Sequence, residues 1–256
     1  MPSTTLGGKL IPEILDKEHV RAAADLVTKY FRLTSDGLPV YTGSHFNSWA
    51  GGGDAEGVAN TITADDLVAV SLLSVKVPGP AAFGILKTHS KDISKLLLDI
   101  PRDIDLADLE ANQFEEILGD NSPADKLWRL LRAFESPRWG IGPTTASKIM
   151  ARKRPRLIPI YDSVVRPLMG LKNSRGHWAA CHAALTDGSD LAGRLQEIRA
   201  GSGISEPISD LRTMDIVLWM YGKQNLPHIA WKQLKLAKKP GQSPDRFHAH
   251  NREPSS

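Results

Sequence analysis

The glycine turn formed by Gly140 and Gly142 constrains this sequence most, because it separates two segments with helical periodicity. Residues 125–135 and 144–152 each carry apolar side chains at the three- and four-residue spacing of a helix. Glycine tolerates positive φ and lets the backbone approach a ligand closely. Pro143 suits the first turn of the second helix, where its missing N–H is not needed. The stretch therefore predicts two helices joined by a tight hairpin.

The start of the second helix is a predicted anion site. Its first N–H groups have no partner within the helix, and together with the helix dipole they favour negative charge. Basic residues follow, at Lys148, Arg152, Lys153, Arg154 and Arg156. Such a row suits a chain of phosphates better than one small anion. The plain alternative is a tight connection between two helices that binds nothing.

A second segment strengthens the nucleic-acid interpretation. The hairpin reads Gly-Ile-Gly-Pro-Thr-Thr-Ala from Gly140, and residues 157–162 read Leu-Ile-Pro-Ile-Tyr-Asp. Together they resemble the helix-hairpin-helix DNA glycosylase superfamily, which includes endonuclease III, adenine glycosylase and alkylpurine glycosylase. In that family a G-[VI]-G-x-x-T-A hairpin precedes an Ile-Pro-x-x-Asp segment with the catalytic aspartate. Asp162 follows Thr144 by 18 positions, a spacing similar to the family's own.

The resemblance implies a mostly α-helical, two-lobed fold with the hairpin at the cleft between the lobes. It implies that Asp162 is the catalytic residue, and that a monovalent cation is bound at the hairpin. It also implies a set of DNA-contacting residues in and after the hairpin. These are Gly140, Gly142, Thr144, Thr145, Lys148 and Arg152.

Two departures from the family pattern restrict the chemistry. Bifunctional members carry a lysine at the position of Thr144, and that lysine forms a Schiff base with the sugar, which threonine cannot do. The expected activity is therefore monofunctional, with base removal by water. Several relatives hold an iron–sulfur cluster with four cysteines, whereas Cys181 is the only cysteine here, so we expect no such cluster. His177, His182 and Cys181 lack matched partners, and we expect no metal site.

Helical periodicity recurs along the rest of the chain, without convincing strand alternation. We expect a single helical domain over residues 1–240, with the hairpin at 126–153 and the aspartate segment at 157–170. Residues 241–256 are polar and predicted to be disordered. Further helices are expected at residues 12–32, 67–77, 81–88, 90–98, 106–118, 175–185, 191–200, 209–221 and 226–236.

Four residues are candidates for contact with a base. Tyr41, Phe46 and Trp49 lie in a long glycine-rich segment, and long irregular segments are often functional. Rings on such a loop stack on bases, or else they pin the loop to the core. Asp215 is a candidate second carboxylate of the pocket. The alternative for Asp215 is an ion pair with Arg212 that holds its helix.

Composition sets the remaining limits. The net charge of +3 is compatible with nucleic acid without requiring it. A single cysteine gives no internal disulfide and indicates a reducing compartment. No apolar run has the length of a membrane span, and no signal peptide is recognisable. We expect a cytoplasmic monomer with no membrane partner, associated with the nucleoid in a bacterium.

The sequence therefore leads to one main hypothesis and one alternative. The main hypothesis is a DNA glycosylase that hydrolyses the N-glycosidic bond of a damaged or modified base. Such an enzyme must extrude the base from the duplex. The alternative is a non-catalytic helix-hairpin-helix module that binds DNA and does not need the carboxylate of Asp162.

Overall fold

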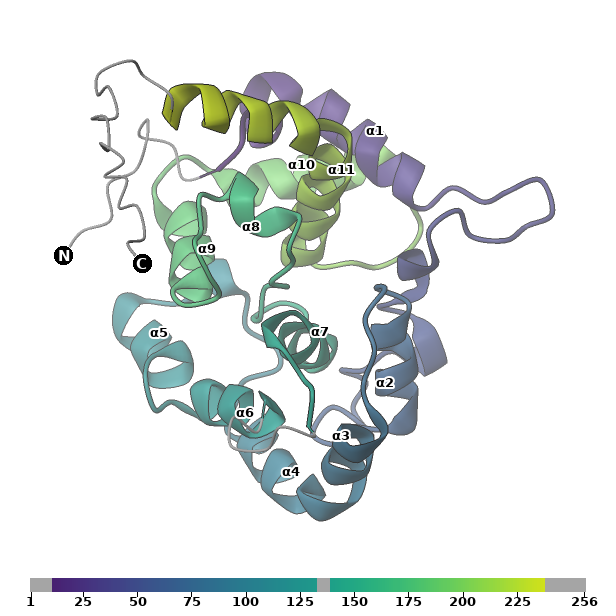
Figure 1. The fold of residues 1–256 in the computed structure, drawn as a ribbon, viewed down its shortest axis with the longest axis vertical. Coiled ribbons are helices and arrows are strands. Elements are labelled where there is room, and N and C mark those ends of the chain that lie inside the picture. The colour runs from purple at the N-terminus through teal and green to yellow at the C-terminus, as the bar shows by residue number, and fades with distance from the viewer. Residues whose placement is uncertain (1–10, 133–138, 238–256) are drawn as a thin grey trace, which may run out of the picture. The chain divides into compact units, whose positions relative to one another are not determined.

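The structure of the protein is a computed structural model that describes residues 11–132 and 139–237 (Figure 1). The described part is mostly helical, as predicted, and has no β-strand; a single bridge pairs Leu33 with Pro39. The α-helices are α1 (Val20–Tyr30), α2 (Ala64–Ser71), α3 (Gly79–Phe83), α4 (Ser90–Leu98), α5 (Ala111–Leu118), α6 (Pro123–Arg132), α7 (Pro143–Lys153), α8 (Val165–Leu168), α9 (His177–Thr186), α10 (Leu191–Ser202) and α11 (Asp210–Ala237).

Shorter helical turns connect them. The 3₁₀ turns are η1 (Glu13–Leu15), η2 (Lys17–His19), η3 (Thr42–His45), η4 (Trp49–Gly51) and η6 (Leu106–Asp108), and η5 (Gly84–Thr88) is a π turn. These turns explain most differences from the expected helices. The helix expected over residues 12–32 starts only at Val20, and the one expected over 67–77 ends at Ser71. Ser74, three residues later, has a left-handed conformation with φ of 59°, so the helix cannot continue to Val77.

Residues up to Lys223 form one compact unit, and residues from Gln224 onward form a second one, so the two are described separately. Within the first unit the helices sort into two groups by their contacts. Helices α2 to α7 pack on one another, with α7 against α2 and α6. Helix α1 packs on α10, and α10 packs on α9. The N-terminal helix α1 is therefore packed against α10, which lies late in the sequence.

Helix α7 lies at the centre of the view in Figure 1. Residues 145–153 are all buried. Five of them are polar or charged: Thr145, Ser147, Lys148, Arg152 and Lys153. A helix buried on all sides is normally apolar. The charged residues of α7 must therefore have internal partners, and these partners define the candidate site. The predicted tail, residues 241–256, lies outside the described residues.

Candidate functional site

The hairpin before α7 has the glycine-dependent geometry that the sequence predicted. Gly140 has a φ of 68°, and a Cβ there would lie 3.0 Å from Cγ of Pro78. Gly142 is the residue before the helix, and no side chain caps the helix at that point. Gly142 is exposed, and no described atom lies within 4 Å of where its Cβ would be. The first amides of α7 thus begin at an open surface.

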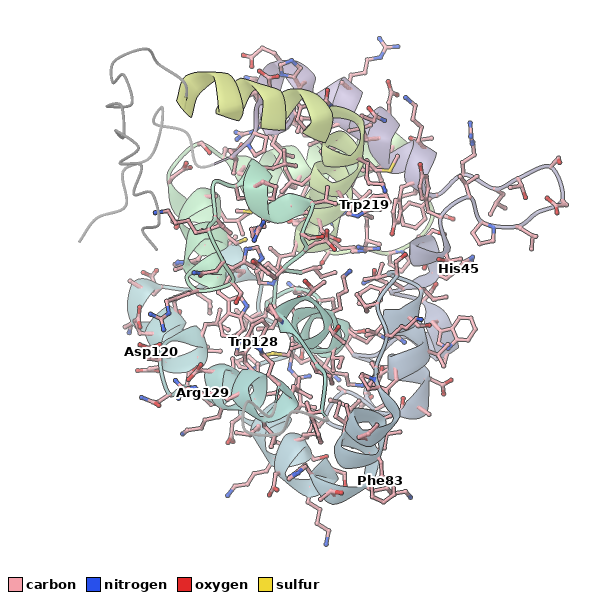
Figure 2. The ribbon with its side chains drawn as sticks, viewed as in Figure 1. His45, Phe83, Asp120, Trp128, Arg129 and Trp219 are labelled. Carbon is pink, nitrogen blue, oxygen red and sulfur yellow. The ribbon has the colours of Figure 1, made fainter. Side chains whose placement is uncertain are left out.

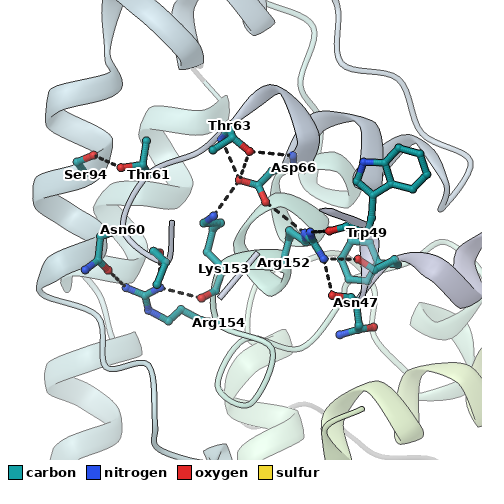
Figure 3. A network of polar contacts seen from close by, with 12 residues as sticks. Asn47, Trp49, Asn60, Thr61, Thr63, Asp66, Ser94, Arg152, Lys153 and Arg154 are labelled. Carbon is teal, nitrogen blue, oxygen red and sulfur yellow. Dashed lines mark hydrogen bonds and ion pairs between the residues drawn. The ribbon is translucent and has the colours of Figure 1, made fainter. Parts of the chain in front are cut away.

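Arg152 and Lys153 form a buried network with Asp66 of α2 (Figure 3). Arg152 Nε lies 3.2 Å from Asp66 Oδ1, and Lys153 Nζ lies 2.8 Å from Asp66 Oδ2. The Arg152 guanidinium also donates to the main-chain oxygens of Phe46, Asn47 and Trp49. The predicted contact between Arg152 and a DNA phosphate is therefore wrong for this structure, because the charge is buried and already paired.

Arg154 is also internal, although it belongs to the same basic run. Its guanidinium donates to the main-chain oxygens of Ala59, Leu97 and Ile100. It also donates to the side chain of Asn60 (Figure 3). Burial lowers the pKa of Arg154 to about 10. These bonds fasten the end of α7 to the segment before α2 and to the end of α4. The basic run of residues 152–154 is thus a structural connection.

Lys148 forms an ion pair with Asp162, the predicted catalytic residue. The two side chains are buried, and Lys148 Nζ lies 3.0 Å from Asp162 Oδ2. Lys148 Nζ also donates to the main-chain oxygen of Leu73 at 3.0 Å. The prediction that Lys148 contacts a DNA phosphate is therefore also wrong. The sequence did not reveal its pairing with Asp162, because the two residues belong to different segments.

Asp162 is held by the chain that follows it as well as by Lys148. The Val164 N–H donates to Asp162 Oδ1 at 2.8 Å, and the Arg166 N–H donates to the main-chain oxygen of Asp162 at 2.9 Å. Helix α8 starts at Val165, so Asp162 lies just before a helix. Both oxygens of the carboxylate are thereby fixed. A fixed, buried carboxylate suits the electrostatic stabilisation of a cation.

A second buried ion pair, Arg212 with Asp215, lies close to Asp162. The Arg212 guanidinium donates to Asp215, and through its other nitrogen to Tyr30 Oη and to the oxygen of Gly43, each at 2.9 Å. Burial raises the pKa of Asp215; Arg212 opposes this shift, and the negative charge of Asp162 adds to it. The two alternatives for Asp215 are thus compatible, because it pairs with Arg212 and also shares an environment with Asp162.

Gly43 allows this arrangement sterically. A Cβ at Gly43 would lie 2.1 Å from Tyr30 Oη and 2.7 Å from Leu73 Cδ2. Any side chain there would displace the hydroxyl that accepts from Arg212. Burial raises the pKa of Tyr30, an effect that nearby Arg212 opposes. From the sequence the segment is recognisable only as rich in glycine, and Gly43 does not stand out.

Aromatic rings flank the second ion pair. Tyr41 stacks on Tyr30 with ring centroids 5.4 Å apart, and Trp219 contacts both rings edge-on. Tyr41 and Trp219 are half-buried (Trp219 is labelled in Figure 2). Of the three predicted aromatic pocket residues, the structure thus brings Tyr41 to the Asp162–Asp215 region. Tyr30 and Trp219 were not among the predicted site residues.

The other two predicted aromatic residues lie elsewhere. Phe46 is a core residue, 1% exposed, with the Arg152 and Arg212 guanidinium carbons 6.0 and 5.2 Å from its ring centroid. Its prediction as a base contact is wrong, because the ring is covered by protein. Trp49 is partly exposed, and its main chain belongs to the Asp66 network while its ring points away from that network (Figure 3).

No described residue forms a convincing metal site. Asp16, Glu18 and His19 have ligand atoms within 4.8 Å of one another, but exposed acidic groups of this kind are common without an ion. A monovalent cation is also predicted at the hairpin, and residues 133–138 of that region lie outside the described part. That site stays a prediction.

These features define a helical protein in which α7 begins at a glycine hairpin and carries Lys148, the partner of the buried Asp162, while a second buried pair, Arg212 with Asp215, lies on α11. The chain belongs to DUF6308, a family of unknown function, whose sequence pattern matches residues 23–222. No curated protein and no solved structure matches the chain. Among the described residues, no helix is both long enough and apolar enough to cross a membrane.

Proposed function

We propose that this protein is a monofunctional DNA glycosylase that removes a damaged or modified base by hydrolysis of the N-glycosidic bond. One observation carries the proposal. Asp162 is a fixed, buried carboxylate, and its partner Lys148 lies on the helix whose N-terminus opens at the Gly140–Gly142 hairpin. A backbone-binding hairpin and a carboxylate are thereby connected by one rigid element. The two groups of helices, α2–α7 and α1 with α9 and α10, support the two-lobed arrangement that the resemblance implies.

In the proposed mechanism Asp162 acts on the sugar. Its charge stabilises the oxocarbenium-like sugar as the base leaves, and one of its oxygens orients the attacking water. Lys148 and the Val164 amide position the carboxylate. Thr144 precedes Lys148 by one helical turn and cannot form an imine, which is the reason for expecting water as the nucleophile.

DNA is the proposed partner, and its backbone is held by the main-chain N–H groups of Gly142, Thr144 and Thr145, since Pro143 has none. Lys148 and Arg152 are unavailable for this role, so other cations must supply the charge. Lys76 is a candidate, because it is exposed and lies two residues before Pro78, whose Cγ would be 3.0 Å from a Cβ at Gly140. Each phosphate that is neutralised adds to the salt dependence of binding. A monomeric state and a cytoplasmic location remain predictions.

The alternative is a non-catalytic DNA-binding module, and one observation favours it. The Lys148–Asp162 and Arg212–Asp215 pairs are buried and internally hydrogen-bonded, as purely structural ion pairs are. Under this alternative the hairpin still binds DNA, whereas Asp162 only stabilises the fold.

The test is base release by the wild-type protein and by Asp162→Asn. Both are incubated with duplexes carrying a panel of damaged and modified bases, treated with hot alkali, and analysed for strand breaks. Asp99→Asn is the matched control, because Asp99 is an exposed aspartate at the end of α4. The assay runs at a temperature at which circular dichroism shows every variant folded.

Strand breaks that require alkali, persist in Asp99→Asn and vanish in Asp162→Asn support the glycosylase. Breaks without alkali contradict the argument from Thr144. Binding to DNA without base release on any substrate, in every variant, identifies the non-catalytic module.

A further inference from the structure

A groove of about 960 Å³ lies beside the segment that carries Asp162, on a face that the proposal above leaves unused. Its walls come from α5, α6 and the start of α9, and Tyr161 contributes to it. Figure 2 labels Trp128, Arg129 and Asp120 along it. Its volume is within the range of about 300–1,000 Å³ that is usual for small-ligand sites.

Two tryptophans line this groove, and both are half-buried. Trp128 of α6 and Trp178 of α9 meet edge-to-face, with ring centroids 5.7 Å apart and planes at 76°. The Arg132 guanidinium carbon lies 5.3 Å from the Trp128 ring centroid. Partly exposed rings of this kind offer a flat apolar face, which every nucleobase can stack on.

Charges around the rings are unevenly distributed. On the α6 and α9 sides, Arg129 is paired with Asp125 at 2.9 Å, and the exposed Arg175 adds positive charge. The acidic groups Glu115 and Asp120 come from α5 and the residues after it. The α6 and α9 sides are therefore the ones suited to a phosphate, because arginine binds it with several donors.

His177 also faces the groove but does not contribute charge. It is buried, its Nε2 lies 3.2 Å from the oxygen of Ile160, and burial lowers its pKa to about 4. Its ring contacts Tyr161 edge-on, with centroids 5.4 Å apart. His177 thus fixes Tyr161, the residue directly before Asp162, and so connects the groove wall to the candidate catalytic segment.

We propose that this groove binds one unstacked nucleotide of a DNA strand, with its base against Trp128 and Trp178 and its phosphate at Arg175. The inference rests on the proposed function, since it assumes that the protein works on DNA with a base out of the stack. The groove supplies what the Asp162 cluster lacks, an open surface with two partly exposed aromatic rings next to the segment that carries Asp162.

The test compares the binding of two fluorescein-labelled duplexes by anisotropy, one fully paired and one with a single unpaired nucleotide. The variants are Trp178→Ala, Trp178→Phe and Arg175→Glu. Phe83→Ala is the control, because Phe83 is an aromatic residue on α3, 67% exposed and away from the groove (Figure 2). Trp178→Phe guards against a folding defect, since it keeps an aromatic face.

The wild-type protein should prefer the duplex with the unpaired nucleotide. Trp178→Ala should reduce that preference by between about fivefold and a hundredfold, the range expected for the loss of one stacking contact. Trp178→Phe should retain most of it, Arg175→Glu should reduce it, and Phe83→Ala should not change it.

Three results would overturn the inference. If the wild type releases a base but Trp178→Ala and Arg175→Glu leave the preference unchanged, the groove is not the nucleotide site and the proposed function stands. If the wild type releases a base but binds both duplexes equally, the groove is again not the nucleotide site, and the proposed function again stands. If it neither binds DNA nor releases a base, the proposed function fails, and the groove assignment fails with it.

Discussion

The Nζ atom of Lys148 lies 3.0 Å from Oδ2 of Asp162, and both side chains are buried. Removing one partner leaves the other as an uncompensated buried charge. We expect Lys148→Met and Asp162→Asn each to lower the free energy of unfolding by about 3–5 kcal/mol. The double variant should lose much less than the sum. Urea denaturation of the four proteins measures this coupling, and additive losses would show that the pair does not interact.

The Asp66 network provides a second prediction, with a neighbouring control. Asp66 balances both Arg152 and Lys153, so Asp66→Asn should lower the free energy of unfolding by about 3–5 kcal/mol. Asp65 is exposed in the same first turn of α2, and Asp65→Asn should cost about 1 kcal/mol or less, through the helix dipole alone. Equal losses in chemical denaturation would indicate that the burial of Asp66 contributes nothing.

The two hairpin glycines should respond differently to alanine. Gly140→Ala places a side chain at positive φ and against Pro78, so it should lower the free energy of unfolding by more than about 1 kcal/mol. Gly142→Ala meets no described atom and keeps an ordinary φ of −86°, so its effect on stability should be smaller.

Gly142→Ala should nevertheless weaken DNA binding, because its methyl group occupies the surface at which a phosphate would approach the first amides of α7. Anisotropy titration of a paired duplex at fixed salt measures this effect. Full binding by a folded Gly142→Ala protein would exclude the hairpin as the phosphate site.

His177 should make the fold sensitive to acid. Its folded pKa of about 4 is below the ordinary value of 6.5, so between these pH values the unfolded chain binds more protons. The free energy of unfolding should therefore fall as the pH falls from 6.5 to 4, by up to roughly 3 kcal/mol from this residue. Thermal or urea unfolding of His177→Gln should show a shallower dependence over this window. If the pH dependence of the free energy of unfolding is the same in His177→Gln as in the wild type, His177 is not the source of the acid sensitivity.

Helical periodicity predicted much of the fold. The apolar spacing in residues 144–152 and 191–200 identified α7 and α10 within a few residues. Both helices bury apolar side chains that recur at helical spacing, which is the pattern the prediction used. The hairpin glycines were also predictable, since only glycine tolerates the φ of Gly140 easily. Local pattern did not predict that α1 begins only at Val20 or that α2 ends at Ser71.

The charged residues of α7 could not be assigned from local pattern. A basic run is usually solvated, yet Arg152 and Lys153 pair with Asp66, which lies 86 and 87 positions earlier. A local signal existed, because Thr63 and Asp66 have the three-residue spacing of a helix capping box, which the structure contains. That signal places Asp66 at a helix start but does not reveal its distant partners.

The packing of α1 on α10 has a consequence for synthesis of the chain. Thr28 of α1 donates to the oxygen of Ser202, 174 positions later. A ribosome releases the N-terminal part first, so the face of α1 that packs on α10 stays uncovered until α10 has emerged. During that interval α1 is a natural target for a chaperone, and nascent chains that stop before α10 should be cleared by proteases.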